Sequence, residues 1–316
     1  MIPALVGATG VGKTALSLEV ADRIGAEIIS MDSRQVYRGM DIGTAKVDPP
    51  ARARIPHHGI DLIDPTERYS AVRFARDARG WVTGIEGRGR VPLLVGGTGF
   101  FLRALVDPVF LEPTVDPVRR DRLRDWLAQR RVEELVDWVR VLDPARASLA
   151  EAGGAQRLSR SIEVPLLTGR ALSWWHQEAP AEAGPLSVGA ILVERPRDQL
   201  YHRIDERSGE MFERGILKEV EGLLGLGYSI DAPGMTAVGY REAAAVLSGE
   251  MTMSEAIDRV SSATRGYARR QLTWFRNQIP NPALRIDASR PLAEQVQEVV
   301  QWWEGIGEDR AGVGGA

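Results

Sequence analysis

Near its start the chain reads Gly7-Ala8-Thr9-Gly10-Val11-Gly12-Lys13-Thr14, which matches the complete spacing of a phosphate-binding P-loop. An apolar run at residues 2–6 precedes it, and an amphipathic run from Ala15 to Ile24 follows it, as a strand and a helix would. Glycines let backbone N–H groups turn inward around phosphate oxygens, and the start of a helix adds partial positive charge. Lys13 supplies a full charge, and the Thr14 hydroxyl is placed to bind magnesium, Mg²⁺. The stretch therefore predicts that residues 7–14 form a polyphosphate site.

Other segments predict an α/β fold. Val91–Val95 is an apolar run typical of a buried strand, and Ala26–Met31 and Ser187–Val193 also read as strands. Ser70 is suited to cap a helix that continues to about Ile85. Since strands alternate with helices, we expect a parallel sheet of the P-loop NTPase-like kind.

The pattern changes after Phe110, where prolines separate segments that look helical and lack strand character. We interpret residues 112–185 as a helical insertion domain within a discontinuous P-loop catalytic core, residues 1–111 and 186–304. Residues 305–316 are rich in glycine and are expected to form a flexible tail.

The composition is that of a folded protein without cysteine chemistry. Of the 316 residues, 44% are hydrophobic and 26% are charged, which argues against disorder. The absence of cysteine excludes disulfides, thiolate zinc sites and cysteine nucleophiles, and no His-x-x-x-His pair suggests a helical zinc site. No apolar run reaches the ~20 residues needed to cross a bilayer, and the N-terminus does not resemble a signal peptide. We therefore expect a cytoplasmic protein with neither zinc nor a membrane partner.

Two strand ends indicate where the chemistry lies. Nucleoside triphosphatases usually end a later strand in an aspartate that holds Mg²⁺, but here Val91–Val95 is followed by Gly96-Gly97-Thr98-Gly99. A carboxylate follows the second strand instead, at Asp32. Since ligands bind beyond the carboxyl ends of parallel strands, we expect Asp32 and Thr98 to face the P-loop. Asp32 is suited to act as a general base or as an outer-shell magnesium ligand.

At this point the sequence resembles the tRNA dimethylallyltransferases, also called tRNA isopentenyltransferases, over roughly residues 3–300. The matching segments, in order, are Gly7–Thr14, Asp32–Lys46, Pro56–His58, Leu93–Gly99, Gln156–Arg160, Val238–Arg241 and Arg269–Arg276. The combination of the Asp32–Lys46 segment with the Gly-Gly-Thr-Gly turn is highly specific.

The resemblance implies transfer of a dimethylallyl group from dimethylallyl diphosphate to the exocyclic amine of adenosine 37 in a tRNA. The P-loop would hold the diphosphate leaving group with Mg²⁺, which accounts for the missing strand-end aspartate. Asp32 would be the general base, Thr98 would contact the target nucleotide or position the base, and Arg207 would lie near the diphosphate.

The resemblance also implies which residues bind the tRNA anticodon stem-loop. They are Asp32, Ser33, Arg34, Gln35, Thr98, Arg120, Gln156, Arg157, Leu158, Ser159, Arg160, Gly239, Tyr240, Arg241, Arg269, Arg270, Gln271 and Arg276.

Residues 265–286 contain five arginines and no acidic residue. If this stretch is helical, Arg269 and Arg276 share a face that we predict contacts anticodon-stem phosphates, while Trp274 packs inward.

Three alternative functions differ in what they bind. An adenylate isopentenyltransferase, acting on a free nucleotide, would need neither the insertion nor the arginine-rich segment. A small-molecule P-loop kinase would turn over ATP, for which the Gly-Gly-Thr-Gly turn is poorly suited. A non-enzymatic RNA-binding P-loop protein would not require intact Lys13, Thr14 and Asp32.

Overall fold

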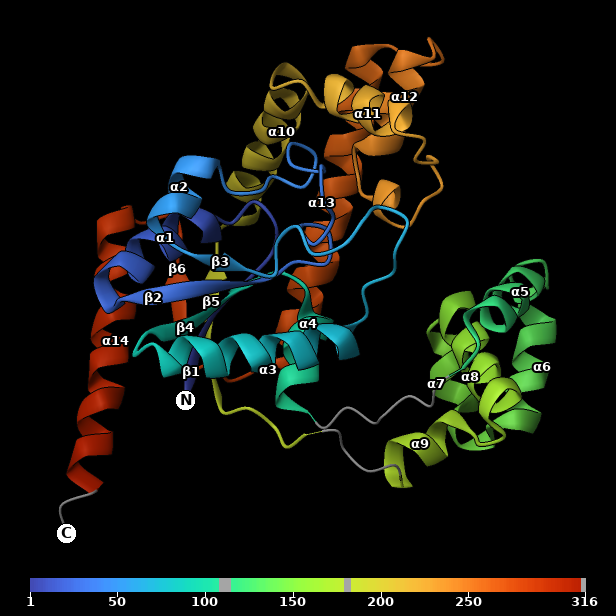
Figure 1. The fold of residues 1–316 in the computed structure, drawn as a ribbon, viewed down its shortest axis with the longest axis horizontal. Helices are drawn as coiled ribbons and strands as arrows, with labels where there is room; N and C mark the ends of the chain where they lie inside the picture. The colour runs from blue at the N-terminus through green and yellow to red at the C-terminus, as the bar shows by residue number, and fades with distance from the viewer. Residues whose placement is uncertain (108–114, 179–182, 314–316) are drawn as a thin grey trace. The chain divides into compact units, whose positions relative to one another are not determined.

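The computed structural model describes residues 1–107, 115–178 and 183–313, with side chains described through residue 306 (Figure 1). The chain forms two compact units. One comprises Met1–Val106 together with Leu186–Ala316, and the other comprises Asp107–Pro185. The first unit contains the sheet and the P-loop, and the second is helical throughout its described part. No described helix is long and apolar enough to cross a membrane.

A parallel sheet forms the centre of the first unit. Within the described residues it has six strands in the order β3-β2-β4-β1-β5-β6, and every neighbouring pair is parallel. The strands are β1 (Ile2–Val6), β2 (Ala26–Met31), β3 (His57–His58), β4 (Val91–Gly96), β5 (Val188–Glu194) and β6 (Leu284–Asp287). All five residues of β1 are buried, as expected for a central strand covered on both faces. The predicted parallel α/β fold is confirmed.

Helices connect and cover the strands. Those of the first unit are α1 (Lys13–Ile24), α2 (Pro49–Arg54), α3 (Ala71–Gly87), α4 (Gly99–Val106), α10 (Arg197–Glu213), α11 (Ile216–Gly225), α12 (Tyr240–Leu247), α13 (Met253–Gln278) and α14 (Leu292–Val313), with a short 3₁₀ turn η2 (Gly234–Thr236). Helix α1 packs beside α14, and α3 packs beside α4. The predicted cap of α3 is present, since the Ser70 side chain accepts a hydrogen bond from the N–H of Arg73.

The second unit has its own apolar core. Its helices are α5 (Pro117–Ala128), α6 (Val132–Leu142), α7 (Ala147–Ala152), α8 (Ala155–Thr168) and α9 (Leu172–Glu178), with the 3₁₀ turn η1 (Pro144–Arg146). Leu127, Leu135, Val139 and Ile162 come together in its centre. Because this core is closed within the insertion, the helices do not depend on the sheet for burial of their apolar faces.

Three details of the fold were not expected. Strand β3 has only two residues, too few for an apolar run to reveal it. Helix α13 ends at Gln278, because Pro280 and Pro282 cannot continue a helix, and Arg285 lies on edge strand β6. Most of the expected flexible tail belongs to α14, which is helical through Val313, while residues 314–316 lie outside the described part of the chain.

Candidate active site

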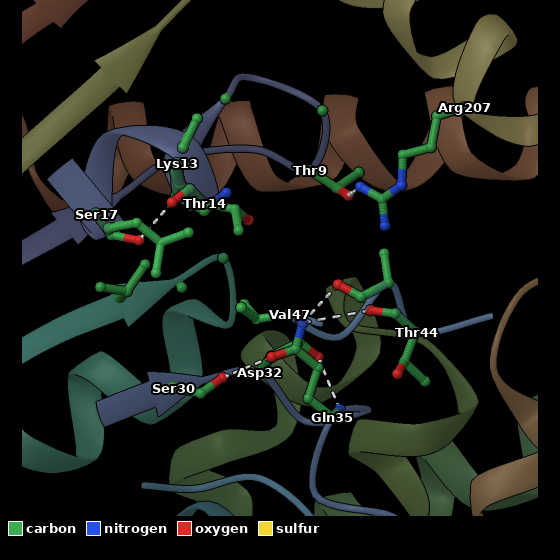
Figure 2. A pocket seen from close by; sticks show the side chains of 18 of the residues that line it. Thr9, Lys13, Thr14, Ser17, Ser30, Asp32, Gln35, Thr44, Val47 and Arg207 are labelled. Carbon is green, nitrogen blue, oxygen red and sulfur yellow. Dashed lines mark hydrogen bonds between the residues drawn. The ribbon is translucent and has the colours of Figure 1, made fainter. Parts of the chain in front are cut away.

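The P-loop, the end of β2 and the end of β4 surround one pocket of about 560 Å³. Lys13 and Thr14 line it from the P-loop, Asp32 from the end of β2, and Arg207 from α10 (Figure 2). A second pocket of about 410 Å³ also has Asp32 and Arg207 in its wall, together with Tyr267. The carboxyl edge of the sheet therefore offers two adjoining spaces that share an aspartate and an arginine.

The P-loop turns tightly because glycines occupy positions where a side chain would clash or be strained. A Cβ on Gly7 would lie 2.4 Å from the carbonyl oxygen of Val193. Gly12 has a φ of 112°, a left-handed conformation that favours glycine, and it caps the start of α1. Lys13, the first residue of that helix, consequently lies where the helix dipole and the free N–H groups face an anion.

Lys13 is held against its own loop. Its Nζ donates hydrogen bonds to the carbonyl oxygens of Gly7 at 2.9 Å and Ala8 at 2.7 Å. Burial lowers the pKa of Lys13 to about 8, the charge of Asp32 opposes this shift, and the charge of Arg207 adds to it. A bound anion would stabilise the charged lysine.

Asp32 and Thr98 meet through the backbone of the turn after β2. Oδ1 of Asp32 accepts hydrogen bonds from the N–H groups of Arg34 at 2.8 Å and Gln35 at 3.4 Å. Among the described residues no hydrogen bond occupies Oδ2. The N–H of Ser33 donates to Oγ1 of Thr98 at 3.2 Å. One carboxylate oxygen is thus anchored, while the other is available to accept a proton in the pocket.

Arg207 lies across the pocket from Asp32, beside the P-loop (Figure 2). Its Nη1 is 3.5 Å from Oγ1 of Thr9. Desolvation lowers the pKa of this guanidinium, and the charge of Asp32 opposes that effect. Lys13 and Arg207 therefore supply two cations to one space, an arrangement suited to a ligand with several negatively charged oxygens.

Tyr267 of α13 was not anticipated by the sequence analysis. It borders both pockets. Burial, followed by the charge of Asp32, raises the pKa of Tyr267. The available signal was its spacing four residues before Gln271 and seven before Trp274, which places the three on one helix face.

The segment after Asp32 is tied to its surroundings. Oε1 of Gln35 accepts a hydrogen bond from Ser30 at 3.0 Å, and Nε2 donates to the carbonyl oxygens of Thr44 and Ala45, both at 3.3 Å (Figure 2). The Gln35 amide is therefore used to hold the loop.

Arg34, the residue before Gln35, contacts the segment at the 3₁₀ turn η2, which follows β5 in the chain. It donates to the carbonyl oxygen of Pro233 and to Oγ1 of Thr236, each at 3.0 Å. Arg34 thus joins the aspartate turn to the wall of the second pocket.

A half-buried carboxylate supports the neighbouring loop. Glu219 accepts hydrogen bonds from the N–H groups of Asp41 at 2.8 Å, Ile42 at 2.7 Å and Gly43 at 3.1 Å. The Tyr240 hydroxyl donates to the same carboxylate at 2.7 Å. Since Tyr240 has no exposed surface, it supports the loop and does not present its side chain to RNA, contrary to our expectation.

The two residues beside Tyr240 lie at the N-terminal end of α12, where Gly239 is buried and Arg241 is exposed. Gly239 has a φ of 104° and caps that helix, and Arg241 forms an exposed ion pair with Asp231 at 2.8 Å.

Helix α13 carries the cationic face that was predicted. Arg269 and Arg276 are exposed, and the guanidinium of Arg270 lies 5.9 Å from the ring centre of Tyr267. Trp274 packs inward, since a Cβ on Gly99 would lie 2.4 Å from its ring. Gln271 is 7% exposed, and its side chain is turned toward the P-loop. The side chain therefore contacts the protein itself and does not contact RNA directly.

The insertion unit gathers arginines around one buried carboxylate. Glu163 is 3% exposed and lies 2.6 Å from Arg124, 2.6 Å from Arg160 and 3.4 Å from Arg120. Three guanidinium groups therefore contact one buried carboxylate, and Arg124 also lies 3.9 Å from the carboxylate of Asp121.

The remaining expected contacts of this unit lie on α8. Gln156 and Arg157 are exposed, Ser159 is half-buried, and Leu158 belongs to the apolar core, so its side chain cannot reach RNA.

Metal ligands are sparse in the part of the chain that the structure describes. It contains no group of three or more His, Asp or Glu residues that could hold a metal ion. Thr14 is exposed in the first turn of α1, and it lines the pocket. A cation here would take one hydroxyl from the protein, with phosphate and water supplying the other ligands, an arrangement common for Mg²⁺.

Known proteins resemble the chain over nearly its full length. A family model described as IPP transferase matches residues 35–278, and one described as isopentenyl transferase matches residues 1–50. A tRNA dimethylallyltransferase of Halorhodospira halophila is 42% identical over 94% of this chain and 96% of its own. One of Geobacter sulfurreducens is 39% identical over 88% of this chain and 89% of its own.

Solved structures agree with these matches. A tRNA isopentenylpyrophosphate transferase from Bacillus halodurans has a TM-score of 0.69 and 34% identity, covering 100% of this chain and 99% of its own. A eukaryotic dimethylallyltransferase, described as acting on tRNA, has a TM-score of 0.75 and 26% identity, covering 91% of this chain and 73% of its own. With a family model over most of its length and relatives of this similarity, the chain belongs to the IPP transferase family.

Proposed function

We propose that the chain transfers the dimethylallyl group of dimethylallyl diphosphate to the exocyclic N6 amine of adenosine 37 in the anticodon loop of tRNA. The observation that carries this proposal is the placement of Asp32. It stands at the junction of a diphosphate-sized cationic pocket and a second space, where an acceptor amine can meet the reacting carbon. The cytoplasm is the compartment that we propose for this reaction.

In this reaction the N6 nitrogen forms a bond to C1 of the dimethylallyl group as the bond from C1 to the diphosphate oxygen breaks. The amine then loses a proton, and Oδ2 of Asp32 accepts it. Inorganic diphosphate is the second product. A positioned general base typically contributes a factor of about 10²–10⁴ to the rate.

The leaving group becomes more negative as the bond breaks. Lys13, Arg207 and the N–H groups of the P-loop stabilise this charge, because they are already oriented toward the pocket before reaction. Cations that are fixed in place need no reorganisation during the chemical step.

A magnesium ion fits the same place. The Thr14 hydroxyl would hold it together with diphosphate oxygens and water, and the ion would supply positive charge to the leaving group.

The acceptor base has to leave the stack of the anticodon loop. Extrusion of a base costs a few kcal/mol, and less in a loop than in a duplex. The second pocket, bordered by Tyr267 and Arg270 of α13, would receive the adenine. The exposed arginines of the same helix, Arg269 and Arg276, would then contact the phosphates of the anticodon stem.

An assay with labelled dimethylallyl diphosphate tests the proposal. Purified protein is incubated with Mg²⁺ and, in separate reactions, with unmodified tRNA, AMP or ATP. We expect label in the tRNA, recovered as N6-dimethylallyladenosine, and none in a matched tRNA whose adenosine 37 is replaced by guanosine. Label in AMP alone would indicate an adenylate isopentenyltransferase, and hydrolysis of ATP without labelled tRNA would indicate a kinase.

A further inference from the structure

Gln271 is a buried glutamine of α13 whose amide joins two loops of the active site. Its Oε1 accepts a hydrogen bond from the N–H of Thr9 at 2.9 Å, and its Nε2 donates to the carbonyl oxygen of Gly97 at 2.9 Å. Thr9 belongs to the P-loop after β1, and Gly97 belongs to the turn after β4. One side chain therefore spans the gap between the diphosphate cradle and the turn that carries Thr98.

The contact is tight and chemically specific. A Cβ on Gly97 would lie 2.4 Å from Nε2 of Gln271, so the turn is pressed against the amide. The N–H of Thr9 needs an acceptor and the carbonyl of Gly97 needs a donor, and an amide provides both. Leucine would leave both backbone groups without these partners, and glutamate would set an oxygen against a carbonyl oxygen.

The turn leads directly to the groups assigned to proton transfer. Thr98 follows Gly97, and its Oγ1 accepts a hydrogen bond from the N–H of Ser33, the residue after Asp32. Contacts therefore run without a gap from the P-loop through Gln271 and the turn to Asp32.

We propose that Gln271 is a positioning residue whose amide sets the distance between the P-loop and the turn of Thr98, and so aligns the diphosphate with the general base. This role rests on the proposed transfer reaction. Both amide atoms already hold backbone groups, so the side chain acts within the protein and not on RNA. Since a misplacement of about 1 Å can lower a rate about 100-fold, loss of the bridge should act on the chemical step.

The test compares Gln271→Leu and Gln271→Glu with a matched control, Gln295→Leu. Gln295 is 6% exposed on α14, and its Nε2 also donates to two backbone carbonyls, of Ala288 and Arg290, but it lines neither pocket. The measurements are the single-turnover rate constant at saturating dimethylallyl diphosphate and tRNA, the Kd for tRNA, and the midpoint of thermal unfolding.

We expect the rate constant to fall about 30- to 100-fold in Gln271→Leu, with the Kd for tRNA within about threefold of wild type. Gln271→Glu keeps the acceptor for Thr9 and should lose less. Gln295→Leu should keep the rate constant within about twofold, even if it unfolds at a lower temperature.

A folded Gln271→Leu variant with the wild-type rate constant overturns the proposal, as does one whose only defect is weaker tRNA binding. If that variant does not fold, Gln271→Glu decides by the same two criteria. Failure of the wild-type enzyme to label tRNA overturns the proposed function and this role with it. Full activity in the Gln271 variants overturns the role alone.

Discussion

Raising the pH from about 7 to about 9.5 should weaken the binding of a non-reactive dimethylallyl diphosphate analogue, because Lys13 loses its proton in that range. Burial against Gly7 and Ala8 lowers the pKa of the Lys13 ammonium to about 8. At about pH 9, only about a tenth of the free enzyme then carries the charged lysine. If that form alone binds the diphosphate, affinity at pH 9 is about tenfold below its low-pH value, a loss of about 1.4 kcal/mol, and about fivefold of that loss occurs between pH 8 and pH 9.

Calorimetric titration of the analogue at a series of pH values and constant ionic strength measures this effect. Affinity should be nearly constant below about pH 7 and then decrease by up to about tenfold per unit above pH 8. Lys13→Arg is the control, since arginine stays protonated across the whole range. The affinity of Lys13→Arg for the analogue should not decrease over the pH range in which lysine titrates, although this variant binds the analogue more weakly than wild type.

Two results would refute this reasoning. Wild-type affinity that stays constant to about pH 9.5 would mean that Lys13 keeps its proton and that burial does not lower its pKa. The same pH dependence in Lys13→Arg would assign the titration to another group.

Raising the pH should have the opposite effect on folding stability, because the lowered pKa of Lys13 makes the folded state more favourable as lysine loses its proton. The unfolded chain has the ordinary lysine pKa of 10.5, so between about pH 8 and pH 10.5 it binds more protons than the folded chain. The contribution of Lys13 to the free energy of unfolding therefore rises with pH in that window. Wild type should gain stability relative to Lys13→Met over this range, as measured by denaturant unfolding at each pH.

Three variants test other parts of the site. Asp32→Ala should lower the single-turnover rate about 10²- to 10⁴-fold while tRNA affinity stays within about tenfold, and retention of more than about a tenth of the wild-type rate would exclude Asp32 as the base. Arg269→Ala combined with Arg276→Ala should weaken tRNA binding and reduce the slope of log affinity against log salt by somewhat under one unit per lost contact; an unchanged slope would mean that this face does not touch RNA. Tyr240→Phe removes one of four hydrogen bonds to Glu219 and should lower the free energy of unfolding by about 1–3 kcal/mol in urea titrations, whereas an unchanged value would show that the hydroxyl does not support the loop.

Local patterns in the chain were sufficient to predict most of the sheet and the strand–loop–helix arrangement of the P-loop. The P-loop spacing at residues 7–14 implies a strand before it and a helix after it, and both are present as β1 and α1. Strand β4 appears as a continuous apolar run, and β2 is a buried strand whose apolar residues are interrupted by Glu27 and Ser30. The Ser70 cap acts on an N–H three residues later, so neighbouring residues contain all the information that it needs.

The roles of the residues on α13, the helix packed over the site, could not be predicted from local patterns. Gln271 meets Thr9 across 262 residues, and no pattern near either residue distinguishes that bridge from an exposed glutamine next to arginines. Tyr240 likewise reads as one residue of a surface motif, but packing buries it completely against the Glu219 carboxylate. Adjacent residues determine backbone conformation, because turns, caps and helical periodicity act over a few positions. Which faces are buried, and which polar groups become partners, depends on how α13 and α12 pack on the loops of the sheet, and that arrangement exists only in the folded chain.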